Sequence, residues 1–206
     1  MHRSPCALSR ELFMVTSPPL SSVRSLLECY LRAKDLNQPA LISECFAADA
    51  ELTFSIATDD IDFPRVVTGA PAIAKTLVAD FGERFDRCRT YYLCVEPHLN
   101  ESRTCEMPWL VIMREKATES LRIGKGTYRW RFSADAGKGD MIVQLHIHIE
   151  RMDALVDPHA EKLNALQSRF SYPWLSPQEL QRSMASFIET GPDFAFAIPF
   201  EQAATL

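Results

Sequence analysis

The sequence has little of several features that mark specialised classes of protein. No block of Lys and Arg appears among its 206 residues, and the formal net charge is −5. A surface for nucleic acid or an anionic membrane needs clustered positive charge, so we expect neither partner. No apolar run approaches the roughly 20 residues that a membrane-spanning helix needs, so we expect no membrane protein.

Glycine and paired cysteines are also scarce. The seven glycines are too dispersed for a phosphate-binding loop, and Gly124-Lys125-Gly126 lies in a strand-like run, where it indicates a bend. The six cysteines include no Cys-x-x-Cys pair, which favours buried free thiols in a reducing compartment. Arg10 and Glu11 interrupt the apolar N-terminal stretch, so we expect a cytoplasmic protein without a secretion signal. We expect no cofactor.

Helical periodicity comes first along the chain. Apolar residues recur at helical spacing from Val23 to Leu31, after a Ser21-Ser22 cap. Pro39 suits the first turn of a short second helix that runs into Phe46. Gly69 to Arg84 returns to helical spacing. The sequence therefore predicts three N-terminal helices, with residues 1–20 as a loose arm.

The period then changes from helical spacing to alternation. Strand-like runs cover residues 51–57, 89–96, 105–116, 121–133 and 141–152, and residues 136–140 read as a hairpin turn. Helices followed by antiparallel strands predict an α+β fold, here a curved sheet closed by the helices into a cone. We expect this domain to span residues 21–152.

A helical extension with an apolar tail is predicted over residues 153–206. Ser176-Pro177-Gln178-Glu179 is a strong helix start, with a Ser cap, Pro in the first turn and Glu at the third position. The tail from Phe194 to Phe200 is unusually apolar and must dock somewhere. One hypothesis places it as a plug in the mouth of the cone.

The segments 30–36 and 41–50, together with Gly69-Ala70-Pro71 and Tyr128-Arg129-Trp130-Arg131-Phe132, resemble the nuclear transport factor 2-like superfamily. That superfamily includes ketosteroid isomerases, scytalone dehydratase and the SnoaL-like polyketide cyclases. The resemblance covers about residues 21–152 and implies the cone fold and a homodimer formed through the open face of the sheet.

Only some catalytic residues of ketosteroid isomerases have a match in this sequence. Tyr30 matches the first-helix tyrosine that donates a hydrogen bond to the developing oxyanion in ketosteroid isomerases. Phe54 and Tyr128 occupy the positions of the two catalytic aspartates. Because proton transfer needs a titrating group, Phe54 argues against the isomerase mechanism. Tyr30 and Tyr128 remain as donors for a carbonyl or hydroxyl.

Several residues are candidates to line an apolar ligand pocket. Strand alternation places Tyr128, Trp130, Phe132 and Arg122 on one face, and we expect that face to look inward. Trp109 and Phe54 are further candidate ligand contacts. Aromatic side chains at this spacing more often pack in a core than contact a ligand. A buried Arg122 would need an anion, from the ligand or from Asp59, Asp60 or Asp62 in the loop before Pro64.

The final strand carries His146, His148 and Glu150 on one face. Three readings stay open: a surface or dimer interface, an interior acid–base pair, or a metal site, which would need further ligands. Since Val143, Leu145, Ile147 and Ile149 form the apolar face, we expect the histidines to point outward. No metal is therefore assigned.

The leading functional hypothesis is a SnoaL-like pocket protein that isomerises, dehydrates or cyclises a small apolar carbonyl or polycyclic compound without a cofactor. Tyr30 and Tyr128 would donate hydrogen bonds. The base would be Asp59, Asp60, Asp62, His146 or His148. The alternative is a non-catalytic ligand-binding or dimerisation module. The sequence names no substrate.

Overall fold

The computed structural model describes residues 22–133 and 139–205, so the predicted arm and most of the 136–140 turn lie outside the described residues. Its helices are α1 (Val23–Asp35), η1 (Pro39–Leu41), α2 (Ile42–Cys45), α3 (Ala70–Ala74), η2 (Lys75–Ala79), α4 (Asp80–Arg84), α5 (Glu161–Gln167), α6 (Pro177–Ile188) and η3 (Pro192–Phe200). The π-helical turn η2 joins α3 to α4 without a break.

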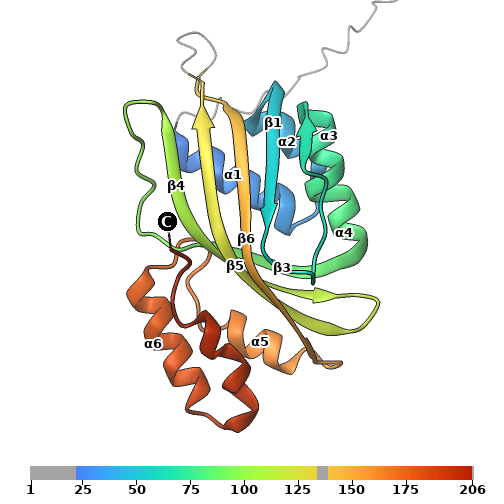
Figure 1. Ribbon diagram of the computed structural model, residues 1–206, viewed down its shortest axis with the longest axis vertical. Helices are drawn as coiled ribbons and strands as arrows, with labels where there is room; N and C mark the ends of the chain where they lie inside the picture. Colours follow the sequence, from blue (N-terminus) through green and yellow to red (C-terminus); the bar gives the residue numbers. More distant parts are fainter. Residues whose placement is uncertain (1–21, 134–138, 206) are drawn as a thin grey trace, which may run out of the picture.

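Six strands form one strongly curved sheet (Figure 1). They are β1 (Phe46–Ile56), β2 (Val66–Thr68), β3 (Phe85–Tyr92), β4 (Thr104–Glu115), β5 (Ser120–Phe132) and β6 (Ile142–Val156), in the order β2-β1-β6-β5-β4-β3. The predicted α+β cone is confirmed. The sheet is mixed, however, because β1 runs parallel to β6. The first and last strands pair only after the chain has crossed over through the helices and the other strands.

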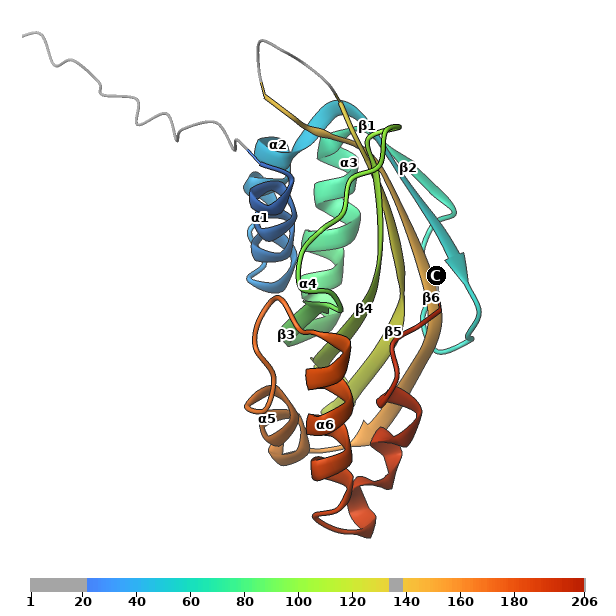
Figure 2. The same cartoon turned by 90° about the vertical axis from the view of Figure 1, so that its left-hand side faces the viewer.

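Helices α1 and α3–α4 cover one face of the sheet and enclose the first core (Figure 2). The start of α1 follows the predicted cap, because Ser22 Oγ accepts a hydrogen bond from the Ser25 amide. Residues Leu27, Tyr30 and Leu31 are fully or almost fully buried, as their helical spacing predicts. From β5, Tyr128, Trp130 and Phe132 enter the same core.

Two element boundaries differ from the sequence prediction. Phe46 was expected to end the second helix, but its backbone is extended (φ −104°, ψ 141°) and begins β1. The third strand begins at Phe85 and ends at Tyr92, so it is shifted toward the N-terminus of the predicted run. A bulge between Asp86 and Arg89, with Arg87 at φ 49°, breaks the alternation that sequence reasoning relied on.

The C-terminal elements α5, α6 and η3 gather at one end of the sheet, apart from α1–α4 (Figures 1 and 2). They form a second core against the opposite face of β3, β4 and β5, which contributes Tyr91, Leu110, Ile112, Leu121 and Ile123. Ala197 and Phe200 of the tail are fully buried in this second core. The plug hypothesis is therefore wrong: the tail covers the other face of the sheet, whose apolar residues also needed burial.

The N-terminal cap of α6 follows the predicted signal, because Ser176 Oγ accepts a hydrogen bond from the Glu179 amide. Within the described ranges, no helix is long and apolar enough to cross a membrane.

Candidate functional site

The cone contains a small apolar cavity of about 40 Å³. It lies between the sheet and helices α1 and α3–α4, and three of its lining residues are polar: Lys34, Thr90 and Tyr128. Its other lining residues are apolar: Phe54, Ile61, Phe63, Leu77, Phe81, Trp109, Val111, Met113, Ile147, Ile149 and Met152. A space of this size holds only a few water molecules, so any larger ligand must displace a side chain.

The most unusual lining residue is Lys34, a lysine on the buried face of α1. Its side chain is 6% exposed, and its Nζ atom lies 2.8 Å from Oδ1 of Asp35, whose side chain is 1% exposed. Nζ also lies 3.3 Å from the Cys88 sulfur and 4.8 Å from the centre of the Phe81 ring. A buried ammonium needs such partners because the protein interior solvates it poorly.

Asp35 anchors this arrangement from behind the cavity. Its Oδ2 accepts hydrogen bonds from the Thr90 amide (2.6 Å) and the Tyr172 hydroxyl (3.1 Å). Its Oδ1 accepts from the Thr90 hydroxyl (3.0 Å) and the Cys88 thiol (3.2 Å). The carboxylate is thus held by α1, by β3 and by the segment between α5 and α6. The C-terminal extension therefore reaches the site through Tyr172.

Electrostatics keep the polar lining residues protonated at neutral pH. Burial alone lowers the pKa of Lys34, but the neighbouring Asp35 and Cys88 outweigh it and raise that pKa. Burial raises the pKa of Tyr128 and raises that of Cys88 to about 12. Lys34 and Tyr128 therefore present N–H and O–H donors to the cavity.

Another donor stands on the cavity wall. The indole Nε1 of Trp109 is buried and has no hydrogen-bond partner among the described residues. The Trp109 ring stacks on Tyr128 with centroids 5.5 Å apart. Gly126 makes room for it, since a Cβ there would lie 2.8 Å from the Trp109 ring. Sequence reasoning placed both Trp109 and Tyr128 in the pocket, and the structure puts both on its wall.

The other aromatic candidates divide into two groups. Phe54 lines the cavity and stacks on Phe63 with ring centroids 4.6 Å apart. Tyr30, Trp130 and Phe132 lie in the first core and are not among the residues that line the cavity. Burial raises the pKa of Tyr30 well above its ordinary value, and the Tyr30 ring packs edge-on against Trp130 at 5.0 Å. Tyr30 is placed as a core residue rather than a first contact for a ligand.

The loop carboxylates lie outside the cone. Asp59, Asp60 and Asp62 are exposed, whereas Ile61 and Phe63 between and beside them line the cavity. Asp62 borders a separate surface depression outside the cone. Apolar and acidic side chains alternate along the loop, so the apolar ones point into the cone and the acidic ones face solvent. No carboxylate from this loop is positioned as a base for a ligand in the cavity.

Arg122 finds a different anion from the expected one. Its guanidinium is bidentate to Glu115, with Nη2 at 2.8 Å and Nε at 3.2 Å from Oε2. This hydrogen bonding lowers the pKa of Glu115. Nη1 of Arg122 lies 3.5 Å from the main-chain oxygen of Asp60. Arg122 therefore ties the loop to the start of β5 and does not line the cavity.

His146 and His148, the histidine row of β6, lie on the outer face of the sheet. Leu145, Ile147 and Ile149 enter the first core, so His146 and His148 face away from the cavity. Nδ1 of His146 is 2.8 Å from Thr53 Oγ1, and Ser55 Oγ lies 3.0 Å from His146 Nε2 and 2.8 Å from His148 Nδ1. Neither imidazole is positioned as an interior acid or base.

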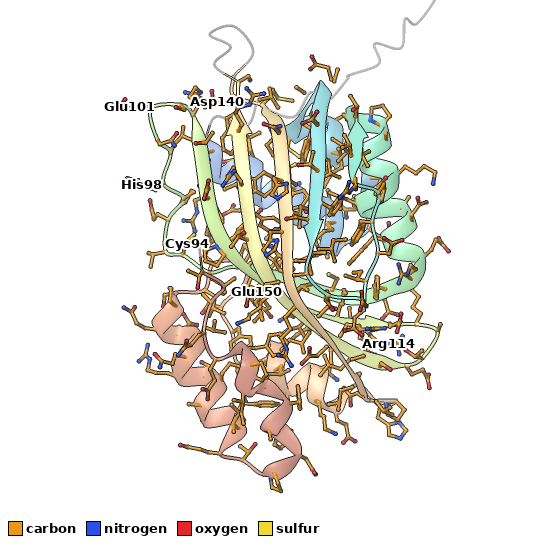
Figure 3. All side chains as sticks on the ribbon, viewed as in Figure 1. Cys94, His98, Glu101, Arg114, Asp140 and Glu150 are labelled. Atoms are coloured by element: carbon orange, nitrogen blue, oxygen red, sulfur yellow. The ribbon has the colours of Figure 1, made fainter. Side chains whose placement is uncertain are left out.

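Glu150 does not complete a metal site with the two histidines. It stands at a bulge in β6 and pairs with Lys125 at 3.2 Å; Figure 3 labels it at mid-length of the sheet. Across residues 22–133 and 139–205, no group of three His, Cys, Asp or Glu side chains is arranged to hold a metal ion.

Sequence reasoning missed Lys34, Asp35, Cys88, Thr90 and Tyr172 as site residues. One signal was present: Lys34 continues the apolar spacing of Leu27, Tyr30 and Leu31 along α1, and a charged residue in such a stripe indicates a buried pair. Nothing in the sequence could place Cys88 and Tyr172 beside it, because both come from distant elements.

The fold and the cavity define a class: an α+β cone protein with an apolar interior cavity. Solved structures share this fold. A nuclear transport factor 2-like superfamily protein from Salmonella enterica serovar Typhimurium is similar with a TM-score of 0.50 at 15% identity, over 59% of this chain and 84% of that one. LinA is similar with a TM-score of 0.54 at 12% identity, over 65% of this chain and 86% of that one.

The hexachlorocyclohexane dehydrochlorinase LinA-type3 from Novosphingobium barchaimii is similar with a TM-score of 0.52 at 12% identity, over 65% of this chain and 87% of that one. The protein therefore has the nuclear transport factor 2-like fold, which confirms the predicted resemblance. No protein-family model matches the sequence, and no curated protein matches it either.

Proposed function

We propose that the protein binds a small, mostly apolar molecule in the cone and holds it through a neutral hydrogen-bond acceptor such as a carbonyl oxygen. The observation that carries this proposal is the convergence of the Lys34 and Tyr128 donors in a mostly apolar cavity. Sites of this kind combine an apolar lining with a few placed polar groups that fix orientation.

Charge balance argues for a neutral ligand. Lys34 is already neutralised by Asp35 at 2.8 Å, so a bound carboxylate would leave one net negative charge in a poorly solvated space. A carbonyl can accept a hydrogen bond without adding charge. Lys34 has three N–H donors, and Asp35 and Cys88 accept two of them.

We infer that a ligand enters the cavity when the loop over residues 57–65 moves. Phe63 fills the cavity wall from this loop and is partly buried, whereas its neighbours Asp62 and Pro64 are exposed. Withdrawal of the Phe63 ring from Phe54 would enlarge the cavity without disturbing the sheet. The loop is held at its base by Arg122 and by the Arg65 carbonyl, which accepts from the Phe54 amide at 3.1 Å.

Methionine methyl groups offer a direct test. Met113 and Met152 line the cavity, while Met184 lies in the second core. On titration with cyclohexanone we expect NMR shifts of the Met113 and Met152 methyl signals and none of Met184. Methylcyclohexane and cyclohexanecarboxylate should bind more weakly than the ketone. Equal shifts at all three methionines, or none, would contradict the proposal.

A second candidate function is cofactor-free catalysis, by isomerisation, dehydration or cyclisation. Lys34 and Tyr128 favour it, because donors fixed in an apolar site stabilise negative charge that develops on an oxygen. One structure of similar fold is named as a dehydrochlorinase. Asp35, the carboxylate paired with the lining residue Lys34, would have to act as the base after a shift of Lys34.

Proton exchange separates binding from catalysis. A catalytic site should speed deuterium incorporation at the carbons beside the carbonyl of cyclohexanone in D₂O, and Asp35→Asn should abolish that gain. Phe63→Ala is the matched variant, since it opens the cavity and leaves Asp35 in place. Exchange at the rate of buffer alone, while the methyl signals still report binding, would leave only the binding function.

A further inference from the structure

We propose that Lys34 and Cys88 form an oxidative modification site, at which a hydroperoxide joins Nζ of Lys34 to Sγ of Cys88 through one oxygen atom. The two atoms lie 3.3 Å apart, which is close enough for one inserted oxygen to span after a small side-chain shift. The side chains come from α1 and β3, so the bridge would link two elements through residues that are 54 positions apart in the sequence.

The surroundings of Cys88 differ from those of other cysteines in the described ranges. The sulfurs of Cys29 and Cys45 both contact the main-chain oxygen of Leu41, at 3.6 and 3.4 Å. Cys88 instead faces an amine at 3.3 Å and a carboxylate at 3.2 Å. The pairing of thiol, amine and base marks Cys88 as the cysteine set up for this reaction.

A second cavity gives an oxidant access to the pair. This space of about 230 Å³ is lined by Lys34, Asp35 and Cys88 on the inner side. Its outer wall includes Leu36, which is 60% exposed, and the exposed Asn37. A hydroperoxide as small as hydrogen peroxide can therefore approach the sulfur from solvent without passing through the cone.

The reaction balances with two molecules of hydrogen peroxide. The first oxidises the Cys88 thiol to a sulfenic acid and releases one water. The second oxidation joins the sulfenic oxygen to the uncharged Lys34 amine and releases two waters, so sulfur and nitrogen each lose two electrons. The product is an N–O–S bridge that retains one hydrogen on nitrogen.

Asp35 is placed to accept the protons that both partners must lose. Its Oδ1 lies 2.8 Å from Lys34 Nζ and 3.2 Å from the Cys88 sulfur. Its Oδ2 accepts from the Tyr172 hydroxyl, and Tyr172 is 40% exposed, which gives a route for protons to solvent. Because burial raises the pKa of Cys88 to about 12, thiolate forms rarely and the reaction is slow.

The bridge would remove the positive charge of Lys34 and leave Asp35 without its ion-pair partner. If the cone binds a ligand as proposed above, oxidation would also withdraw one donor from that site. The modification itself does not depend on that function, since it needs only the geometry of the two side chains.

Peptide mass spectrometry tests the proposal on the full chain. The reduced protein is treated with hydrogen peroxide, its free thiols are blocked after unfolding, and it is digested with trypsin. We expect residues 33–65 to appear joined to Cys88-Arg89, about 14 Da above the sum of the two peptides, for one oxygen gained and two hydrogens lost. Dithiothreitol should separate them.

Lys34→Arg and Cys88→Ser are the matched variants, with circular dichroism to show that each is folded. Neither should give the joined peptide, and Cys88 in the Lys34→Arg variant should proceed to sulfinic acid. Wild-type protein in which Cys88 reaches sulfinic acid while trypsin still cleaves after Lys34 would overturn the proposal. So would a joined peptide about 2 Da lighter than the sum, which indicates a direct S–N bond or a disulfide between Cys88 and Cys45, the cysteine within residues 33–65.

Discussion

Lys34 Nζ lies 2.8 Å from Oδ1 of Asp35, its neighbour in the chain, and both side chains are buried at the end of α1. Replacing one residue of this ion pair with an uncharged one leaves the other charge buried without a partner. We expect Lys34→Met and Asp35→Asn each to lower the free energy of unfolding by about 3–5 kcal/mol.

The double variant Lys34→Met/Asp35→Asn should lose less than the sum of the single losses, because no charge then remains buried without a partner. Urea unfolding of all four proteins measures this coupling. Additive losses would show that the two side chains do not act as a pair. The exposed Lys75–Asp80 pair, at 2.6 Å, is the control, for which Lys75→Met should change stability by less than about 1 kcal/mol.

The outer histidine row predicts a pH dependence of stability. Burial, with Arg129 next, lowers the pKa of His146 from its ordinary value of 6.5, so the folded protein favours the neutral imidazole. Below that value the unfolded chain binds more protons than the folded one. Stability contributed by His146 is therefore present above pH 6.5 and is lost as pH falls through the lower folded pKa.

The variant His146→Gln should flatten the decline of unfolding free energy below pH 6.5. His159→Gln, at an exposed position, is the control. If both variants decline as steeply as the wild type on acidification, His146 is not the group responsible.

Much of this fold could be predicted because its signals are local. The apolar spacing from Val23 to Leu31 and the Ser176 cap depend on residues within two turns, and both appear as predicted. The site was harder because its contacts are not local. Asp35 receives hydrogen bonds from Thr90 and Tyr172, 55 and 137 residues away.

The second core shows the same limit. The alternation in β5 correctly placed Tyr128 and Trp130 inside, but it did not indicate that the opposite face is also buried. In the structure Leu121 and Ile123, on that opposite face, are covered by the C-terminal helices. Alternation identifies two faces of a strand; it does not say what covers the second one.

The close packing of β5 against β6 should allow only glycine at position 126. A Cβ at this position would lie 1.9 Å from the main-chain oxygen of His148, so β5 and β6 would have to separate. We expect Gly126→Ala to cost about 3 kcal/mol or more in unfolding free energy. Gly191→Ala is the control, because its Cβ would meet nothing closer than 4.0 Å. Equal thermal midpoints for both variants would contradict this reading.

A substitution in the apolar tail should lower the stability of the protein without changing ligand binding in the cone. Phe200 is fully buried in the second core, so Phe200→Ala should lower the free energy of unfolding by about 3–5 kcal/mol. The Met113 and Met152 methyl signals should still respond to cyclohexanone at a temperature where the variant is folded. A change in cyclohexanone affinity would contradict this separation of the tail from the cone.

The proposed binding function depends on the donors inside the cone, and a crystal structure with bound 4-bromocyclohexanone tests them most directly. Anomalous scattering from bromine fixes the position and direction of the probe. We predict a probe inside the cone, with its oxygen within hydrogen-bond distance of Lys34 Nζ or the Tyr128 hydroxyl and Phe63 displaced. A probe bound only outside the cone, or with its oxygen turned away from both donors, would contradict the account.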